Sequence, residues 1–348
     1  GGPAVISGTS AGGINAALIA AGKTPGEMLQ FWRAIADDPP VTASTEFFDG
    51  ALRSLVRLAA EEWLRWMTST ELARAFLQRL RNRRTLSPGS VVALWVEYLL
   101  TARFELVSRF LEGIREPFIA DTARLRARLV DVFGGERVPN HGLRLALNTV
   151  DAHTGRVVRY VTAPAPVTRS PDYVIVDAIT VDMVLASASI PLLFPPVQIG
   201  PHLLWDGGLL VNTPLAPVVA LGAEEIVTVL VTEPADPHPG PLAHFGRAVE
   251  RTVDSFLENA YNIDRKLLLE RNRVTRLQGG PYREVTLYEA VRPMRDAVFN
   301  AGSYLYFERH ILNAMYDAGR RAAGAWLAGG PRVDQLEEPA VSVAVPVP

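Results

Sequence analysis

Along the chain, short continuous runs of apolar residues alternate with segments in which apolar residues recur at helical spacing. This pattern predicts strands and helices in turn. Runs typical of strands begin at Val5 and cover 143–150, 156–162 and 226–231. The last of these is rich in β-branched residues, so we expect it to form a buried parallel strand. Helical spacing covers 14–21, an insertion over 47–118, about 245–276 and 303–326. The pattern predicts one α/β domain over 1–330 that contains the helical insertion, followed by a loose tail over 331–348.

The first strand runs directly into a Gly-x-Ser-x-Gly motif, Gly8-Thr9-Ser10-Ala11-Gly12, and then into a helix of small residues. This order is typical of a nucleophile elbow, in which a tight turn holds the serine in a strained conformation at a helix N-terminus. We expect Gly8 and Gly12 to leave room for neighbouring chain. The amide of Ala11 and the helix dipole would favour a developing oxyanion. The alternative is a glycine-rich turn without chemistry.

A second motif, Asp206-Gly207-Gly208, follows the apolar run that begins at His202. The aspartate ends a predicted strand, and the two glycines permit a sharp turn. Taken alone, such an aspartate could simply bind local backbone amides. We expect both glycines, like those of the elbow, to tolerate no larger residue.

Together with the block Ala188-Ser189-Ile190-Pro191 between them, these motifs make residues 3–231 resemble the patatin-like phospholipase family. The resemblance implies a three-layer α/β/α fold with a mainly parallel central sheet. It also implies a Ser-Asp dyad, with Ser10 as the nucleophile and Asp206 as the base. Phe194-Pro195-Pro196 fits the same intervening block.

The resemblance implies hydrolysis of fatty acyl esters, such as those of phospholipids, through an acyl-Ser10 intermediate and without a metal or other cofactor. Asp206 can act as a base only if its pKa rises from about 4 toward the working pH. The apolar flanks of the motif are expected to cause that rise by desolvation. These flanks are Leu203, Leu204, Leu209 and Leu210.

The family's glycine-rich oxyanion loop has no counterpart before the elbow, where the chain starts with Gly1-Gly2-Pro3. Pro3 has no amide hydrogen to donate. We therefore expect a chain clipped at its N-terminus, whose activity is low because the loss of an oxyanion donor typically costs about a hundredfold or more.

Three other interpretations stay open at this point. An α/β-hydrolase would add a histidine partner, for which His238, His244 and His310 are the candidates. An acyltransferase with a similar elbow would also need a histidine. The third is a lipid-binding module that does not catalyse.

Composition and net charge narrow the range of possible binding partners and sites. A net charge of -2 over 348 residues gives no nucleic-acid signature, and the absence of cysteine excludes disulfides and zinc-thiolate sites. No apolar stretch reaches the roughly 18 residues of a membrane span. Contact with a lipid interface through the insertion is an expectation, and the predicted location is cytoplasmic or peripheral to a membrane.

Overall fold

The computed structural model describes residues 2–68, 78, 81, 93, 104–163, 170–232, 245–279, 283–293 and 308–336. The chain divides into two compact units. The first comprises Gly1–Val41, Thr122–Pro191 and Pro195–Pro348, and the second comprises Thr42–Asp121 and Leu192–Phe194. The insertion predicted over 47–118 falls within the second unit. Most of the predicted tail lies outside the described residues.

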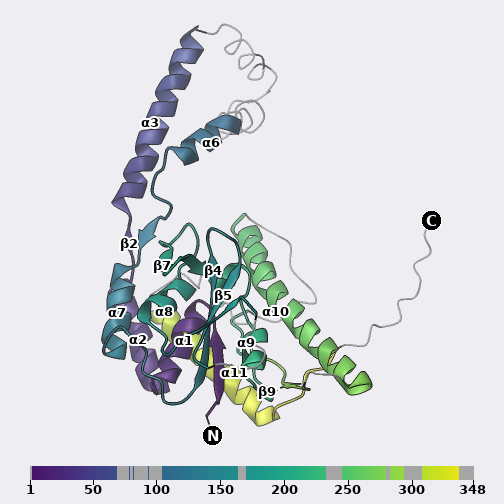
Figure 1. Ribbon diagram of the computed structural model, residues 1–348. Coiled ribbons are helices and arrows are strands. Elements are labelled where there is room, and N and C mark those ends of the chain that lie inside the picture. Colours follow the sequence, from purple (N-terminus) through teal and green to yellow (C-terminus); the bar gives the residue numbers. More distant parts are fainter. Residues whose placement is uncertain are drawn as a thin grey trace, which may run out of the picture. The chain divides into compact units, whose positions relative to one another are not determined.

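The central sheet of the first unit is built around β4 (Arg144–Asp151), as Figure 1 shows. One edge of β4 pairs antiparallel with β5 (Val157–Val161), and β6 (Tyr173–Ile175) runs parallel to β5. The other edge pairs in parallel with β1 (Val5–Gly8) and antiparallel with β8 (His202–Asp206).

The prediction of a mainly parallel sheet is therefore wrong for the described strands, although the α/β class is confirmed. Three of the pairings, β4–β5, β4–β8 and β7–β8, are antiparallel, with β7 spanning Val197–Ile199. The connections explain this, because β4 to β5 and β7 to β8 are short hairpins and parallel neighbours need a long crossover. Gly155 and Gly200 have positive φ angles of 67° and 56° in these two turns.

Helices cover both faces of this sheet, so β4 is buried along almost its whole length. On one face, Leu145 and Leu147 pack with Leu204 and with apolar side chains of the helices that cover this face. On the other face, Ala146 and Val161 pack against Leu221 at the end of α9. The helices on the first of these faces are α1 (Ala11–Ala20), α2 (Pro25–Asp37), α7 (Ala123–Phe133) and α8 (Val181–Ser187). The helix on the second face is α9 (Ala216–Ala220).

A smaller core lies beside α9, where β9 (Glu225–Ile226) and β10 (Thr286–Leu287) form a parallel pair packed near α10 (Phe245–Gln278). The sequence predicts a buried parallel strand over 226–231. The parallel pairing is confirmed at Ile226 with Leu287 and at Val229 with Val291, but the expected burial of the whole run is wrong. Residues 226, 228 and 230 are buried, whereas 227, 229 and 231 are exposed, so the run covers a core on one side only. The predicted C-terminal helix is α11 (Arg309–Gly329), which packs on α2.

The second unit contains α3 (Thr45–Thr68) and α6 (Phe104–Glu112), together with the short antiparallel pair β2 (Thr42–Ala43) and β3 (Ala120–Asp121). The hydroxyl of Ser54 donates to the carbonyl of Phe110 at 3.0 Å, which ties α3 to α6. Arg109 and Glu61 form an ion pair between the same helices. Most of residues 69–103 of the predicted helical insertion lie outside the described residues.

Within the described ranges, no helix combines the length and the apolar character needed to cross a bilayer. Large apolar side chains are nevertheless exposed on α3. They are Phe48, Leu52, Leu55, Val56, Trp63 and Leu64, with 51–66% of each side chain accessible.

Candidate active site

Ser10 lies between the last residue of β1 and the first residue of α1, at the sharp turn that the motif predicts. Its φ and ψ angles are 56° and -132°, a strained combination for a residue with a side chain. Hydrogen bonds hold it there: the Ser10 N–H donates to the carbonyl of Ser187 at 2.8 Å, and the Ser10 carbonyl accepts from Gly13 N–H at 2.8 Å. The backbone around the serine is therefore fixed by its neighbours.

The elbow has room only for glycine at two positions, Gly8 and Gly13, and only Gly8 belongs to the Gly-x-Ser-x-Gly motif. A Cβ at Gly8 would overlap the carbonyl of Gly12 and lie 2.7 Å from the nitrogen of Gly13. Gly12 itself is exposed and a Cβ there meets nothing within 4 Å, so the expectation that packing requires glycine at this position is wrong. The crowded position is Gly13, where a Cβ would stand 2.8 Å from the hydroxyl oxygen of Ser187.

Asp206 ends β8 and is only 3% exposed. Its Oδ1 accepts the Gly208 N–H at 2.7 Å, and its own N–H donates to the carbonyl of Ser189 at 2.8 Å. Burial raises the pKa of Asp206 to about 6, although hydrogen bonds with the Ser10 side chain and the Gly208 amide act in the opposite direction. The two predicted catalytic side chains therefore meet, and the carboxyl is poised to gain and lose a proton near neutral pH.

The flanking leucines contribute less to this burial than their sequence suggests. Leu204 is fully buried, but Leu209 and Leu210 are 59% and 50% exposed. The prediction that all the flanks shield the carboxyl is therefore wrong for the pair after the motif.

The sheet topology explains why residues almost two hundred positions apart meet. Strands β1 and β8 run along the same edge of β4 from opposite directions, and their C-terminal ends face each other. Gly8 pairs with Leu147, and Asp206 pairs with Thr149. Only Asn148 separates the two partners on β4, so this strand aligns both strand ends at one point.

The end of α8 holds the same two residues from another direction. Ser187 and Ser189 present carbonyls two positions apart, and these accept the N–H groups of Ser10 and Asp206 respectively, both at 2.8 Å. The start of the intervening block noted in the sequence, together with Ser187 just before it, thus binds the backbones of both motif residues.

The remaining motif positions tie the two loops together. Thr9 is buried and its hydroxyl donates to the carbonyl of Val211 at 2.9 Å, which connects the elbow to the chain after Gly208. A Cβ at Gly207 would lie 2.5 Å from the carbonyl oxygen of Asn148, so glycine is required there. A Cβ at Gly208 would lie 3.1 Å from Oδ1 of Asp206.

Sequence reasoning did not identify Asn148 or Ser187 as part of this site. Both are completely buried, and the Ser187 hydroxyl donates to the backbone carbonyl of Asn148 at 2.9 Å. The signal for Asn148 is an amide side chain that stands next to Thr149 in a strand whose other residues from Leu145 to Val150 are apolar. A buried polar residue in such a strand must find hydrogen-bond partners, and here they lie on β1.

Ala11 begins α1, so its N–H has no acceptor within the helix. This places a backbone donor directly after Ser10. No group of three or more histidine, aspartate or glutamate side chains that could hold a metal ion occurs in the part of the chain that is described.

The histidine interpretations gain no support from the described residues. His310 stands at the start of α11 with 73% of its side chain exposed, and its Nδ1 lies 3.3 Å from Glu308. His238 and His244 lie outside the described residues.

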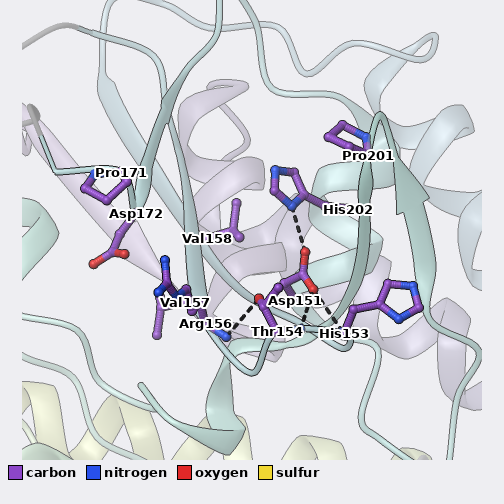
Figure 2. A pocket seen from close by; sticks show the side chains of 10 residues that line it. All are labelled: Asp151, His153, Thr154, Arg156, Val157, Val158, Pro171, Asp172, Pro201 and His202. Atoms are coloured by element: carbon purple, nitrogen blue, oxygen red, sulfur yellow. Dashed lines mark hydrogen bonds and ion pairs between the residues drawn. The ribbon is translucent and has the colours of Figure 1, made fainter.

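A histidine–carboxylate pair does occur on the sheet, at the opposite end of β8 from Asp206. Asp151 and His202 line a hollow of about 340 Å³, and Nδ1 of His202 lies 2.7 Å from Oδ2 of Asp151. Figure 2 shows these two side chains pointing toward each other. Burial would raise the pKa of Asp151, but the hydrogen bonds from His202 and from the backbone amides of Thr154 and His153 lower it to about 2. The residues lining this hollow include neither Ser10 nor Asp206.

Comparison with known proteins identifies the family of the chain. The family model described as Patatin-like phospholipase matches residues 2–219, a range that includes Ser10, the end of α8 and Asp206. A search of curated proteins finds no match. The matched range covers more than half of the chain, and the chain therefore belongs to the patatin-like phospholipase family, a family of lipid acyl hydrolases.

Proposed function

We propose that this protein hydrolyses fatty acyl esters of phospholipids or related lipids, with Ser10 as the nucleophile and Asp206 as the general base. The observation that carries the proposal is the pairing of a strained serine with a buried carboxyl whose pKa is raised to about 6. A serine hydroxyl is a weak nucleophile until a base takes its proton, and Asp206 is the group in contact with it.

In the first half of the reaction, Oγ of Ser10 attacks the ester carbonyl carbon while its proton passes to the Asp206 carboxylate. The tetrahedral intermediate carries its negative charge on the former carbonyl oxygen. The N–H of Ala11 and the N-terminal end of α1 would stabilise this charge. Collapse of the intermediate breaks the ester bond, and the alcohol leaves with the proton from Asp206.

In the second half, Asp206 takes a proton from water, and the resulting hydroxide attacks the acyl-Ser10 carbonyl. Collapse releases the fatty acid and returns the proton from Asp206 to Ser10 Oγ. The same carboxyl thus acts as base and acid in each half, a role that needs a pKa near the working pH. Burial of Asp206 supports that role.

The lipid substrate class suggests a role for the second unit at a lipid surface. The exposed apolar side chains of α3, together with Arg53 and Arg57 on the same helix, support contact with a lipid interface. This part of the proposal is independent of the dyad and has its own test in the Discussion.

The decisive experiment treats the 348-residue chain and its Ser10→Ala variant with a fluorophosphonate probe and records the intact masses. We expect the unaltered protein to gain one probe mass and Ser10→Ala to gain none. A His310→Ala variant should label like the unaltered protein, because its side chain is exposed and paired with Glu308. A folded protein that gains no mass would refute the proposal and favour the lipid-binding module that does not catalyse.

A further inference from the structure

Asn148 occupies the one position of β4 between the residues that pair with the two strand ends. It is completely buried, with 0% exposure, although an amide side chain is costly to bury. Since an aliphatic residue would suit the middle of this buried strand better, the reason for an asparagine must lie in what its groups bind.

The side chain of Asn148 binds β1 immediately before the nucleophile. Its Nδ2 donates to the carbonyl of Gly8 at 2.9 Å and lies 3.1 Å from the hydroxyl oxygen of Ser7. Gly8 is the last residue of β1 and stands two positions before Ser10. The amide therefore fixes the direction in which the chain enters the elbow.

The backbone carbonyl of Asn148 faces the other parts of the site. It accepts the hydroxyl hydrogen of Ser187 at 2.9 Å, and the hydroxyl oxygen of Ser187 lies 3.3 Å from the Ser10 nitrogen. The same carbonyl lies against Gly207, directly after Asp206, where a Cβ would approach its oxygen to 2.5 Å. One residue thus touches the neighbours of both members of the dyad.

A second buried asparagine allows a comparison of how the two amide side chains are hydrogen-bonded. Asn272 on α10 is 5% exposed, and both of its amide atoms are paired, with Nδ2 donating to the Val285 carbonyl and Oδ1 accepting the Val285 N–H. Oδ1 of Asn148, in contrast, has no hydrogen-bond partner among the described residues. A buried acceptor without a partner lowers stability, so Asn148 is poorly explained as a stabilising residue.

We propose that Asn148 is a positioning residue for the dyad, which sets the distance and direction between Ser10 and Asp206 by binding the end of β1 through its side chain. The inference rests on the acyl-hydrolase function proposed above. Misplacement of reacting groups by about 1 Å can cost about a hundredfold in rate, so loss of this hydrogen bond should lower the rate of the chemical step.

The test measures fluorophosphonate labelling of the 348-residue chain over a range of probe concentrations, which separates the maximal rate constant from the half-saturating probe concentration. The variants are Asn148→Ala and Asn148→Asp, and the second keeps the shape of the side chain if the first fails to fold. Asn272→Ala is the matched control, because it also removes a buried asparagine but stands on α10. Thermal unfolding of each variant is recorded in parallel.

We expect both Asn148 variants to lose about tenfold to a hundredfold in the maximal rate constant, with a half-saturating concentration within about twofold of the unaltered protein. Asn272→Ala should unfold at a lower temperature but label at the original rate. Folded Asn148 variants that label normally, or an equal loss in Asn272→Ala, would overturn the inference. If the unaltered protein itself is not labelled at Ser10, the proposed function fails and this inference with it.

Discussion

Replacing Asp206 by asparagine should make the protein more stable above pH 6 while it abolishes labelling of Ser10. Asparagine has almost the same shape and can still accept the Gly208 N–H that Oδ1 of Asp206 accepts at 2.7 Å. It carries no charge, however, and the site that surrounds Asp206 is almost completely closed to solvent. The variant therefore isolates the cost of the buried negative charge.

The size of that cost follows from the pKa of Asp206. Burial raises this pKa from 3.8 to about 6, and each pKa unit corresponds to about 1.4 kcal/mol. The ionised carboxylate therefore lowers the free energy of unfolding by about 3 kcal/mol. Between pH 3.8 and about 6 the folded protein binds more protons than the unfolded chain at this residue, so its contribution to stability falls as the pH rises.

Urea unfolding at several pH values between 4 and 8, followed by circular dichroism, measures this effect. We expect Asp206→Asn to gain stability over the unaltered protein as the pH rises through 4 to 6, and to keep a constant gain of about 3 kcal/mol above that. Asp131→Asn, which replaces an exposed carboxyl on α7, should show no such gain. If the difference in the free energy of unfolding between Asp206→Asn and the unaltered protein does not change with pH, the assignment of a raised pKa to Asp206 is refuted.

Three further predictions test other parts of the structure. Gly8→Ala should fail to fold or lose labelling, since its Cβ would overlap the Gly12 carbonyl, whereas Gly12→Ala should stay folded; circular dichroism and labelling distinguish the two. His202→Asn should leave the labelling rate within about twofold of the original, since the hollow that this histidine lines does not contain the dyad, and a larger loss would link the two sites. Leu52→Asp on α3 should reduce co-sedimentation with phosphatidylcholine and phosphatidylglycerol vesicles, and Leu327→Asp, on the exposed surface of α11, should not; equal behaviour of the two variants would contradict a lipid-binding role for α3.

The sequence predicts those parts of the fold that depend on local pattern. The Gly-x-Ser-x-Gly run locates the turn between β1 and α1 because only certain residues fit its backbone angles. The apolar run 143–150 corresponds to β4 to within one residue at each end. The direction of the strands could not be read in the same way, because a buried central strand is apolar on both faces whether its neighbours are parallel or antiparallel.

The glycines show a similar limit within the site. Gly8, Gly12 and Gly13 look alike in the sequence, but their importance depends on contacts with distant residues. Gly13 is crowded by Ser187 on α8, about 170 residues further along, and Gly12 faces open space. Such contacts arise only when the helices pack, so the motif pattern alone assigned the requirement to the wrong position.

The two residues of the proposed dyad, Ser10 and Asp206, are held in place mainly by backbone hydrogen bonds. The strained backbone of Ser10 persists because the carbonyl of Ser187 binds its amide, and the register of Asp206 is set by Thr149 and by the carbonyl of Ser189. Every one of these contacts comes from the backbone of β4 or of the α8 end, which substitutions of side chains alter little. Three side chains add to these contacts: Asn148 donates to the end of β1, the Thr9 hydroxyl to the carbonyl of Val211, and the Ser187 hydroxyl to the carbonyl of Asn148. A site built in this way should therefore tolerate changes in most surrounding side chains and be sensitive at the few positions, Asn148 among them, whose side chains make these hydrogen bonds.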